Sequence, residues 1–320
     1  MTNILDIEKN KRNDDYKLIH ESIERAEQGI RAISIMYDEH SSDENSQENI
    51  FWQKNNIYYK LLSIRFQYKI FLEQLYHAEK QLLEIFKSDP NSFDGFMQGN
   101  PYFEKVEAEL ASIFDNIIFN AVSIFDYLSH DICYICKANK QKTDYWSKLA
   151  KYANGKNNEI ANLQIAPLIC LVNSEFVGKL YDYRSRLIHR KRDIHKFTAK
   201  INFNPVDLNV NIFVSDEFIS KQYLKIIRDE HPEFDNISLT YTSSWVIKRT
   251  LSEIERILEG LVFEIKSNSN FLNNLNKKKN GNGFITGLIN PITKKFINIS
   301  DIMWWQYKGN VDLQWLNPKY

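Results

Sequence analysis

The chain has 320 residues with 41 basic and 41 acidic side chains, so its bulk charge gives no reason to expect a general nucleic-acid or membrane coat. An apolar content of 43% can build one large core or two smaller ones, and ten Gly and seven Pro argue against extended disorder. We therefore expect one main helical domain, in which any electrostatic function is local.

The first thirty residues contain no apolar segment that resembles a signal-peptide core, and no later run approaches twenty apolar residues. Cys133, Cys136 and Cys170 are an odd number of cysteines without a secretory signal. The sequence predicts a soluble, cytoplasmic protein with reduced thiols and no membrane partner.

Long helices are predicted in the first half of the chain. Apolar residues recur at helical spacing over residues 14–40 and 51–88, and Pro90 follows the second of these segments. A third helix is expected to begin near Pro101 and to end near Asn139. The polar segment between the first two helices lacks the apolar content to pack.

Shorter elements are predicted next. Residues 143–153 and 173–195 show helical spacing of their apolar side chains, whereas residues 200–214 alternate apolar and polar side chains around an Asn-Pro turn. We predict a small strand pair there, in an insertion over about residues 199–240. Residues 243–268 return to a helix, with a Ser available as its N-cap.

The C-terminal part is expected to be an extension of a helical domain formed by residues 1–270. A polar linker is predicted over residues 271–283, and residues 284–320 are predicted to form a hairpin that turns at Asn290 and Pro291. The Trp-rich end has apolar residues at strand-like spacing and either covers the core or stacks on nucleic-acid bases. The predicted fold class is mainly all-α: a helical bundle with long antiparallel helices, a β-hairpin insertion and a C-terminal hairpin.

The stretch YDYRSRLIHRKRDIH, residues 181–195, places two histidines in the most basic segment of the chain. Arg184 is followed after four residues by His189, and Ser185 is the polar neighbour of the arginine. Arg190 and His195 have the same spacing. We prefer the first pair because the apolar residues between its members can anchor the segment against a core, whereas those of the second pair are almost all charged.

The Arg-x4-His spacing with an adjacent polar residue resembles the signature of the HEPN superfamily, the higher eukaryote and prokaryote nucleotide-binding domains. Long helices precede the motif, and NIIFNAVSIFDYLSHDI resembles the inner helix that precedes it in those domains. The resemblance covers roughly residues 50–265, by pattern. It implies a helical bundle that acts as a metal-independent RNA endonuclease, often as a homodimer, in toxin–antitoxin or other defence systems. An antitoxin or another protein partner is then expected.

Metal-free RNA cleavage needs proton transfer and stabilisation of charge on the phosphate. A histidine suits the proton transfer because its ordinary pKa of about 6.5 lies near neutrality. An arginine stays charged and binds two phosphate oxygens with its planar fork. We assign His189 as the general base or acid, Arg184 as the phosphate clamp, and Ser185 or Arg186 as a supporting polar contact.

Further basic residues are expected to hold the flanking RNA backbone in a salt-sensitive and largely sequence-blind manner. They are Arg190, Lys191, Arg192, Lys196 and Lys200. The simpler alternative is a solvated basic helix face. At the level of function, the alternative is a catalytically inactive helical module of the same fold that binds RNA, nucleotides or a protein.

A polar stripe is predicted along the third helix. Its members recur at spacings of three and four: Asn116, Asn120, Ser123, Tyr127 and His130. The stripe suits a cleft or a dimer interface, and the alternatives are hydrogen bonds between helices or simple exposure. Asp126 at its border is a candidate to orient the motif. We expect no metal and no cofactor: His130, Cys133 and Cys136 lack a second ligand pair, and no Gly-rich phosphate loop occurs.

Overall fold

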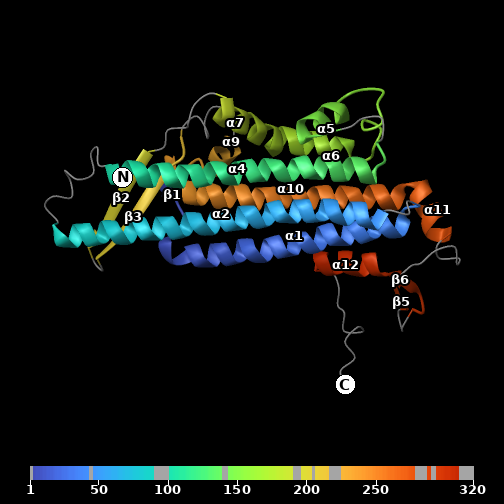
Figure 1. Ribbon diagram of the computed structural model, residues 1–320, viewed down its shortest axis with the longest axis horizontal. Helices are drawn as coiled ribbons and strands as arrows, with labels where there is room; N and C mark the ends of the chain where they lie inside the picture. Colours follow the sequence, from blue (N-terminus) through green and yellow to red (C-terminus); the bar gives the residue numbers. More distant parts are fainter. Residues whose placement is uncertain are drawn as a thin grey trace, which may run out of the picture. The chain divides into compact units, whose positions relative to one another are not determined.

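The computed structural model describes residues 3–42, 46–89, 101–138, 143–189, 196–203, 206–215, 225–277, 287–289 and 293–309. The fold is mainly α-helical with small β-hairpins, which confirms the predicted fold class (Figure 1). The α-helices of this part of the chain are α1 (Arg12–His40), α2 (Ser46–Ser88), α4 (Pro101–Ile135), α5 (Trp146–Ala153), α6 (Ala166–Val172), α7 (Gly178–His189), α9 (Lys225–Glu230), α10 (Leu239–Ser267), α11 (Ser269–Lys277) and α12 (Ile299–Lys308).

Strands occur in pairs. The two strands β1 (Ile4–Leu5) and β4 (Asn236–Ile237) are parallel. Antiparallel hairpins are formed by β2 (Lys196–Phe203) with β3 (Val206–Phe213), and by β5 (Gly287–Ile289) with β6 (Phe296–Asn298). Both hairpins were predicted, although the predicted turn residues Asn290 and Pro291 lie outside the described residues.

The chain divides into two compact units. Unit 1 consists of Met1–His20, Lys60–Ser123 and Ser174–Thr250, and unit 2 of Glu21–Tyr59, Ile124–Asn173 and Leu251–Tyr320. The division falls inside helical segments, including α1, α2, α4 and α10. Helical periodicity is continuous across these points, so it carries no information about where tertiary contacts cluster.

Unit 1 is joined by a partly buried polar network around Asp15. The Asp15 carboxylate, on α1, accepts hydrogen bonds from the Tyr68 hydroxyl of α2 over 2.7 Å and from the Ser244 hydroxyl of α10 over 3.0 Å. Lys248 lies 2.5 Å from the same carboxylate. Burial and the Asp15 charge raise the pKa of Tyr68 well above its ordinary value. These contacts fix the positions of α1, α2 and α10 along one another within unit 1.

Unit 2 is built around Trp146, whose side chain is fully buried. Its ring packs edge-on against Phe125 at 5.3 Å between ring centres, and its indole N–H donates to the side-chain oxygen of Asn173 over 3.2 Å. Elsewhere in this unit, Gly260 on α10 allows a close approach of α6, since an added Cβ would come within 2.8 Å of Leu168.

Three predicted elements need correction. Helix α10 begins at Leu239, and the hydroxyl of Ser238 accepts the backbone N–H of Tyr241, so the N-cap precedes the predicted one by about five residues. Helix α11 occupies residues 271–277 of the predicted linker and buries Phe271 and Leu275. The Trp-rich end contains helix α12 in place of strand-like structure.

Candidate functional site

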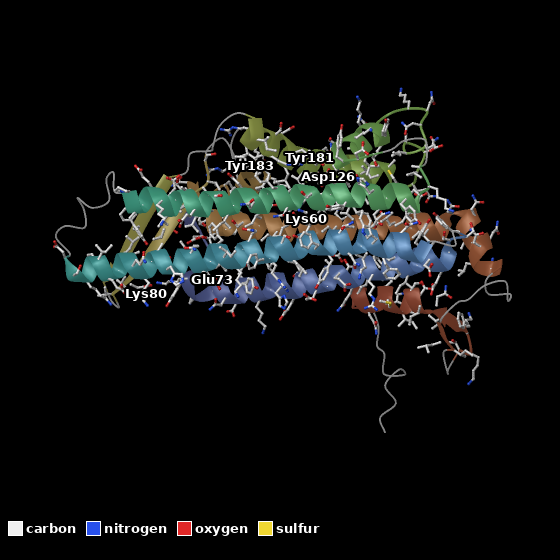
Figure 2. The ribbon with its side chains drawn as sticks, viewed as in Figure 1. Lys60, Glu73, Lys80, Asp126, Tyr181 and Tyr183 are labelled. Carbon is white, nitrogen blue, oxygen red and sulfur yellow. The ribbon has the colours of Figure 1, made fainter. Side chains whose placement is uncertain are left out.

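Helix α7 carries the Arg184 and His189 motif and follows directly on a π-helical segment, Asn173–Val177. Leu180 and Tyr183 on α7 are fully buried and fix its inner side, and Tyr183 is labelled in Figure 2. π-helical turns are rare and are frequently found at functional sites. The motif is therefore carried by an anchored helix.

The described polar side chains of the motif differ in their exposure on α7. Arg184 is half-buried, and its guanidinium lies 5.9 Å from the centre of the Tyr181 ring. Ser185 is exposed and Arg186 is half-buried. An arginine guanidinium is planar, and its forked donors match two oxygens of a phosphate.

The spacing of the motif has a geometric consequence. An α-helix turns about 100° per residue, so positions 184 and 189 are about 140° apart around the axis of α7. Arg184 and His189 thus stand on different faces of one helix.

The second half of the basic segment lies outside the described residues. His189 is the last residue of α7 and Lys196 the first of β2, but the structure describes neither side chain, nor residues 190–195 with Arg190, Lys191, Arg192 and His195. The structure therefore brings together Arg184, Ser185 and Arg186 on one helix. A pairing of the Arg184 and His189 side chains, and the choice between the two Arg-x4-His pairs, stay predictions.

Asp126 has a clear structural contact. One oxygen of its carboxylate accepts the backbone N–H of Trp146 over 2.9 Å, at the first residue of α5. A carboxylate at this position satisfies an unpaired amide of the helix N-terminus and interacts favourably with the helix dipole. Asp126 belongs to unit 2 and α7 to unit 1.

The polar stripe of α4 forms hydrogen bonds within its own helix. The side chains of Asn116, Asn120 and Ser123 donate to carbonyl oxygens one turn earlier over 3.0, 2.9 and 2.8 Å. Lys60 of α2 also donates to the Asn120 side chain over 3.3 Å. Of these contacts, only the one between Lys60 and Asn120 joins two helices, and Asn116 and His130 are exposed.

Sequence analysis missed a cluster around His231. Its Nε2 lies 2.6 Å from the Tyr241 hydroxyl, and its Nδ1 lies 3.8 Å from a carboxylate oxygen of Glu233. Burial and the nearby charges of Glu230 and Glu233 raise the pKa of Tyr241, so the phenol stays protonated and is a poor nucleophile. His231 and Tyr241 are ten residues apart in the chain, and no sequence motif links them.

The cysteines lie in surroundings that suppress thiolate chemistry. Burial raises the pKa of Cys133, whose sulfur lies 2.8 Å from the Thr143 hydroxyl, and raises that of Cys136 well above its ordinary value. Among the described residues, no three His, Cys, Asp or Glu side chains are grouped as metal ligands would be. Reactive-thiol chemistry therefore has no support at these positions.

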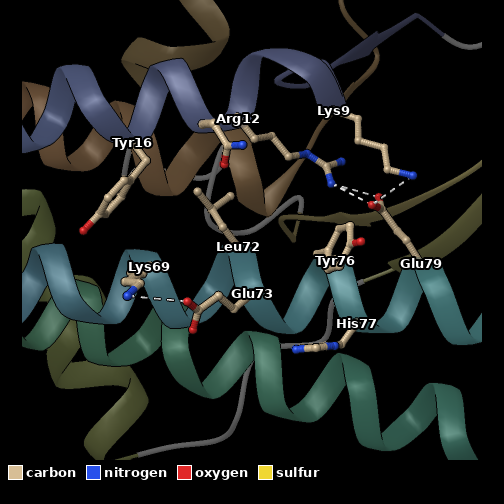
Figure 3. Close-up of a pocket in the computed structure, with 10 residues that line it drawn as sticks. Lys9, Arg12, Tyr16, Lys69, Leu72, Glu73, Tyr76, His77 and Glu79 are labelled. Carbon is tan, nitrogen blue, oxygen red and sulfur yellow. Dashed lines mark hydrogen bonds and ion pairs between the residues drawn. The ribbon is translucent and has the colours of Figure 1, made fainter.

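A second candidate site, also missed from sequence, is a groove between the start of α1 and the C-terminal half of α2 (Figure 3). Its volume is about 650 Å³. At one end, Nη1 of Arg12 donates to both oxygens of Glu79 over 2.9 and 3.0 Å, and the backbone N–H of Val210 donates to the same carboxylate over 3.1 Å. Lys9 pairs with Asp207 over 2.7 Å beside them. This ion cluster attaches the β2–β3 hairpin to the helices.

Of the described helices, α4 alone is long and apolar enough to cross a membrane, and half of its apolar stretch is buried inside the protein. The core helix of a soluble protein has the same features. A cytoplasmic location stays a prediction.

Comparison of the chain with protein-family models, with curated proteins and with solved structures found no match in any of the three. The function must therefore be argued from the residues and their geometry.

Proposed function

We propose that the protein is a HEPN-like, metal-independent RNA endonuclease in which Arg184 and His189 cleave RNA by attack of the ribose 2′-hydroxyl. The observation that carries this proposal is that half-buried Arg184 and exposed Ser185 stand side by side on a helix that Leu180 and Tyr183 anchor. The mainly helical fold and the basic residues that follow α7 in the sequence also support it.

The chemistry fits these residue types. A base removes the proton of the 2′-hydroxyl, O2′ attacks phosphorus, the bond from phosphorus to O5′ breaks, and O5′ receives a proton. The products are a 2′,3′-cyclic phosphate and a 5′-hydroxyl. Histidine supplies the proton transfers, and the Arg184 guanidinium stabilises the charge that builds on the phosphate.

A homodimer belongs to the proposal. The reaction needs both a base and an acid, whereas each chain contributes one His189. Positions 184 and 189 also face different sides of α7. Two copies that share one cleft would supply two histidines and let the arginine of one chain meet the histidine of the other. A protein partner, such as an antitoxin, would then act by covering this cleft.

The test is cleavage of labelled RNA in EDTA by the wild type and by the variants Arg184→Ala, His189→Ala and His195→Ala. We expect 2′,3′-cyclic phosphate ends, and a loss of about 100- to 1000-fold in rate for the first two variants. His130→Ala, at an exposed histidine on α4, is the matched control and should cleave like the wild type. Loss in His195→Ala alone would assign the second pair. A folded, dimeric wild type that binds RNA without cutting it would identify a silent binding module.

A further inference from the structure

The groove between α1 and α2 has the size and lining of a small-molecule site. Its volume of about 650 Å³ lies within the range of about 300–1,000 Å³ that is usual for ligand pockets. Leu72 and Tyr76 of α2 and Tyr16 of α1 supply apolar and aromatic walls. A flat ring with a short polar substituent fits such a groove.

The charges around the groove favour an uncharged ligand. Arg12 is paired with Glu79, Lys9 with Asp207, and Lys69 with Glu73. Because each cation already has a carboxylate, the groove offers little net charge to a polyphosphate. An uncharged ligand enters without leaving a buried ion pair broken.

One of these ion pairs is available to a ligand. Lys69 and Glu73 stand one helical turn apart on α2, with their side chains 3.6 Å apart and 54% and 57% exposed. Exposed pairs of this kind contribute little to stability, so exchanging their mutual contact for contacts with a ligand costs little. Together they present ammonium donors beside a carboxylate acceptor.

An aromatic side chain faces this pair from the other helix. In Figure 3, Tyr16 projects from α1 toward the stretch of α2 that carries Lys69 and Glu73. Leu72 lies between Tyr16 and Tyr76 along the groove. A planar ring stacked on Tyr16 would therefore present its edge to Lys69 and Glu73.

We propose that this groove binds a guanine base, with Tyr16 as the stacking platform and the Lys69–Glu73 pair as the reader of its hydrogen-bonding edge. Guanine is uncharged and places a carbonyl oxygen beside two N–H donors. The two donors match the two oxygens of Glu73, and the carbonyl oxygen matches the Lys69 ammonium. Adenine, cytosine and uracil each lack one of these groups. This site is separate from α7, and the inference does not depend on the proposed nuclease activity.

The first experiment measures binding of guanosine, inosine, adenosine, cytidine and uridine to the full chain by calorimetry. Guanosine should bind most tightly. Inosine lacks only the 2-amino group, so it should bind about tenfold more weakly, as expected for the loss of one charge-assisted hydrogen bond. Equal binding of guanosine, inosine and adenosine would overturn the proposal.

The variant Glu73→Gln keeps the shape of the side chain and removes its charge. It should weaken guanosine binding by at least about tenfold and bring guanosine close to inosine. The matched control is Glu109→Gln on α4, because Lys105 and Glu109 form a similar exposed pair with the same spacing, 3.7 Å apart. The control should bind guanosine like the wild type. Unchanged guanosine binding by folded Glu73→Gln would contradict the proposed reader.

The base can come from a free nucleoside or from an RNA strand. A uridine hexamer with one central guanosine, carrying 2′-O-methyl groups throughout, separates the two sources and resists cleavage by 2′-hydroxyl attack. Tighter binding of this hexamer than of guanosine assigns the site to RNA, and equal or weaker binding assigns it to the free nucleoside. Both assignments hold only if guanosine binds more tightly than the other nucleosides. If the protein prefers guanosine but does not cleave RNA, the nuclease proposal is refuted and the guanine site still stands.

Discussion

Two buried carboxyl groups, Glu79 in unit 1 and Asp131 in unit 2, have similar exposure and different surroundings. Only 1% of Glu79 and 2% of Asp131 is exposed. Glu79 accepts hydrogen bonds from Arg12 and from the backbone of Val210. Within the described residues, Oδ1 of Asp131 accepts no hydrogen bond.

The difference shows that partners, more than burial, decide which buried acid can keep its charge. Burial raises the pKa of Glu79, and the Arg12 guanidinium opposes that rise. Burial raises the pKa of Asp131 to about 7 without an opposing contact. A carboxyl group in the second situation is about half protonated at pH 7, whereas the first forms part of an ion cluster.

Removal of Arg12 is expected to have the largest effect on stability, because it leaves Glu79 buried with few partners, as Asp131 is. Arg12→Ala leaves Glu79 buried without its main partner, and loss of one member of a buried pair costs about 3–5 kcal/mol. Urea unfolding at pH 7 measures the change. The control Lys105→Ala, which disrupts an exposed pair, should change the free energy of unfolding by less than about 1 kcal/mol. An equal effect of the two substitutions would contradict the role of the Arg12–Glu79 pair.

The double variant Arg12→Met/Glu79→Leu sharpens the same point. It removes both charges and keeps apolar volume, so it should recover most of the stability that Arg12→Ala loses. Val210 loses its hydrogen-bond acceptor in this variant, and therefore recovery is expected to fall short of the wild type by about 1 kcal/mol.

Asp131→Asn tests the other carboxyl group. The pKa of Asp131 is about 7 in the folded protein against an ordinary value of 3.8, so the folded state holds one more proton between about pH 4 and pH 7. Stability of the wild type therefore falls as pH rises through this window. Asn cannot ionise, and the variant should be more stable than the wild type at pH 8, by up to about 4 kcal/mol. Parallel pH profiles of the two proteins would show that Asp131 does not carry this proton.

Glu39 is expected to behave like Asp131, with a smaller effect. Burial raises its pKa to about 7, and a hydrogen bond from the Ser300 hydroxyl of α12 partly opposes that rise. Stability should again fall between about pH 4.5 and pH 7, and Glu39→Gln should remove up to about 3 kcal/mol of this fall. Hydrogen exchange of the α12 amides, compared at pH 5 and pH 8, shows whether the loss is local. Glu259→Gln, at an exposed carboxylate that contacts Lys308 of α12, is the control.

Local patterns in the sequence predicted the long helices and both hairpins, because each rests on spacing within one segment. The α10 N-cap was placed too late because Ser243 and Ser244 have the same cap preference as Ser238. The Trp-rich end was interpreted as strand-like because a short apolar run does not distinguish a strand from a buried helix.

Of the two candidate sites, one could be found from local sequence and the other could not. The Arg184 and His189 motif is local and could be found from the sequence, whereas whether its side chains meet depends on tertiary and quaternary geometry. The groove joins residues 9–16 with residues 69–79, which are brought together by the packing of α1 and α2. No sequence spacing signals that approach, and Lys69 and Glu73 alone indicate an ordinary exposed helix pair.

Glu73→Gln is expected to change stability least of these variants. It therefore shows whether a loss of guanosine binding arises without a loss of folding. The Lys69–Glu73 pair is exposed on both sides, in contrast to Arg12–Glu79, so its loss should change the free energy of unfolding by less than about 0.5 kcal/mol. Urea unfolding without ligand measures this change. The same variant should lose the stabilisation that saturating guanosine gives the wild type, because a ligand stabilises only a folded state that binds it. A large loss of stability without ligand would mean that Glu73 supports the packing of α2, and its effect on guanosine binding would then carry no information about recognition.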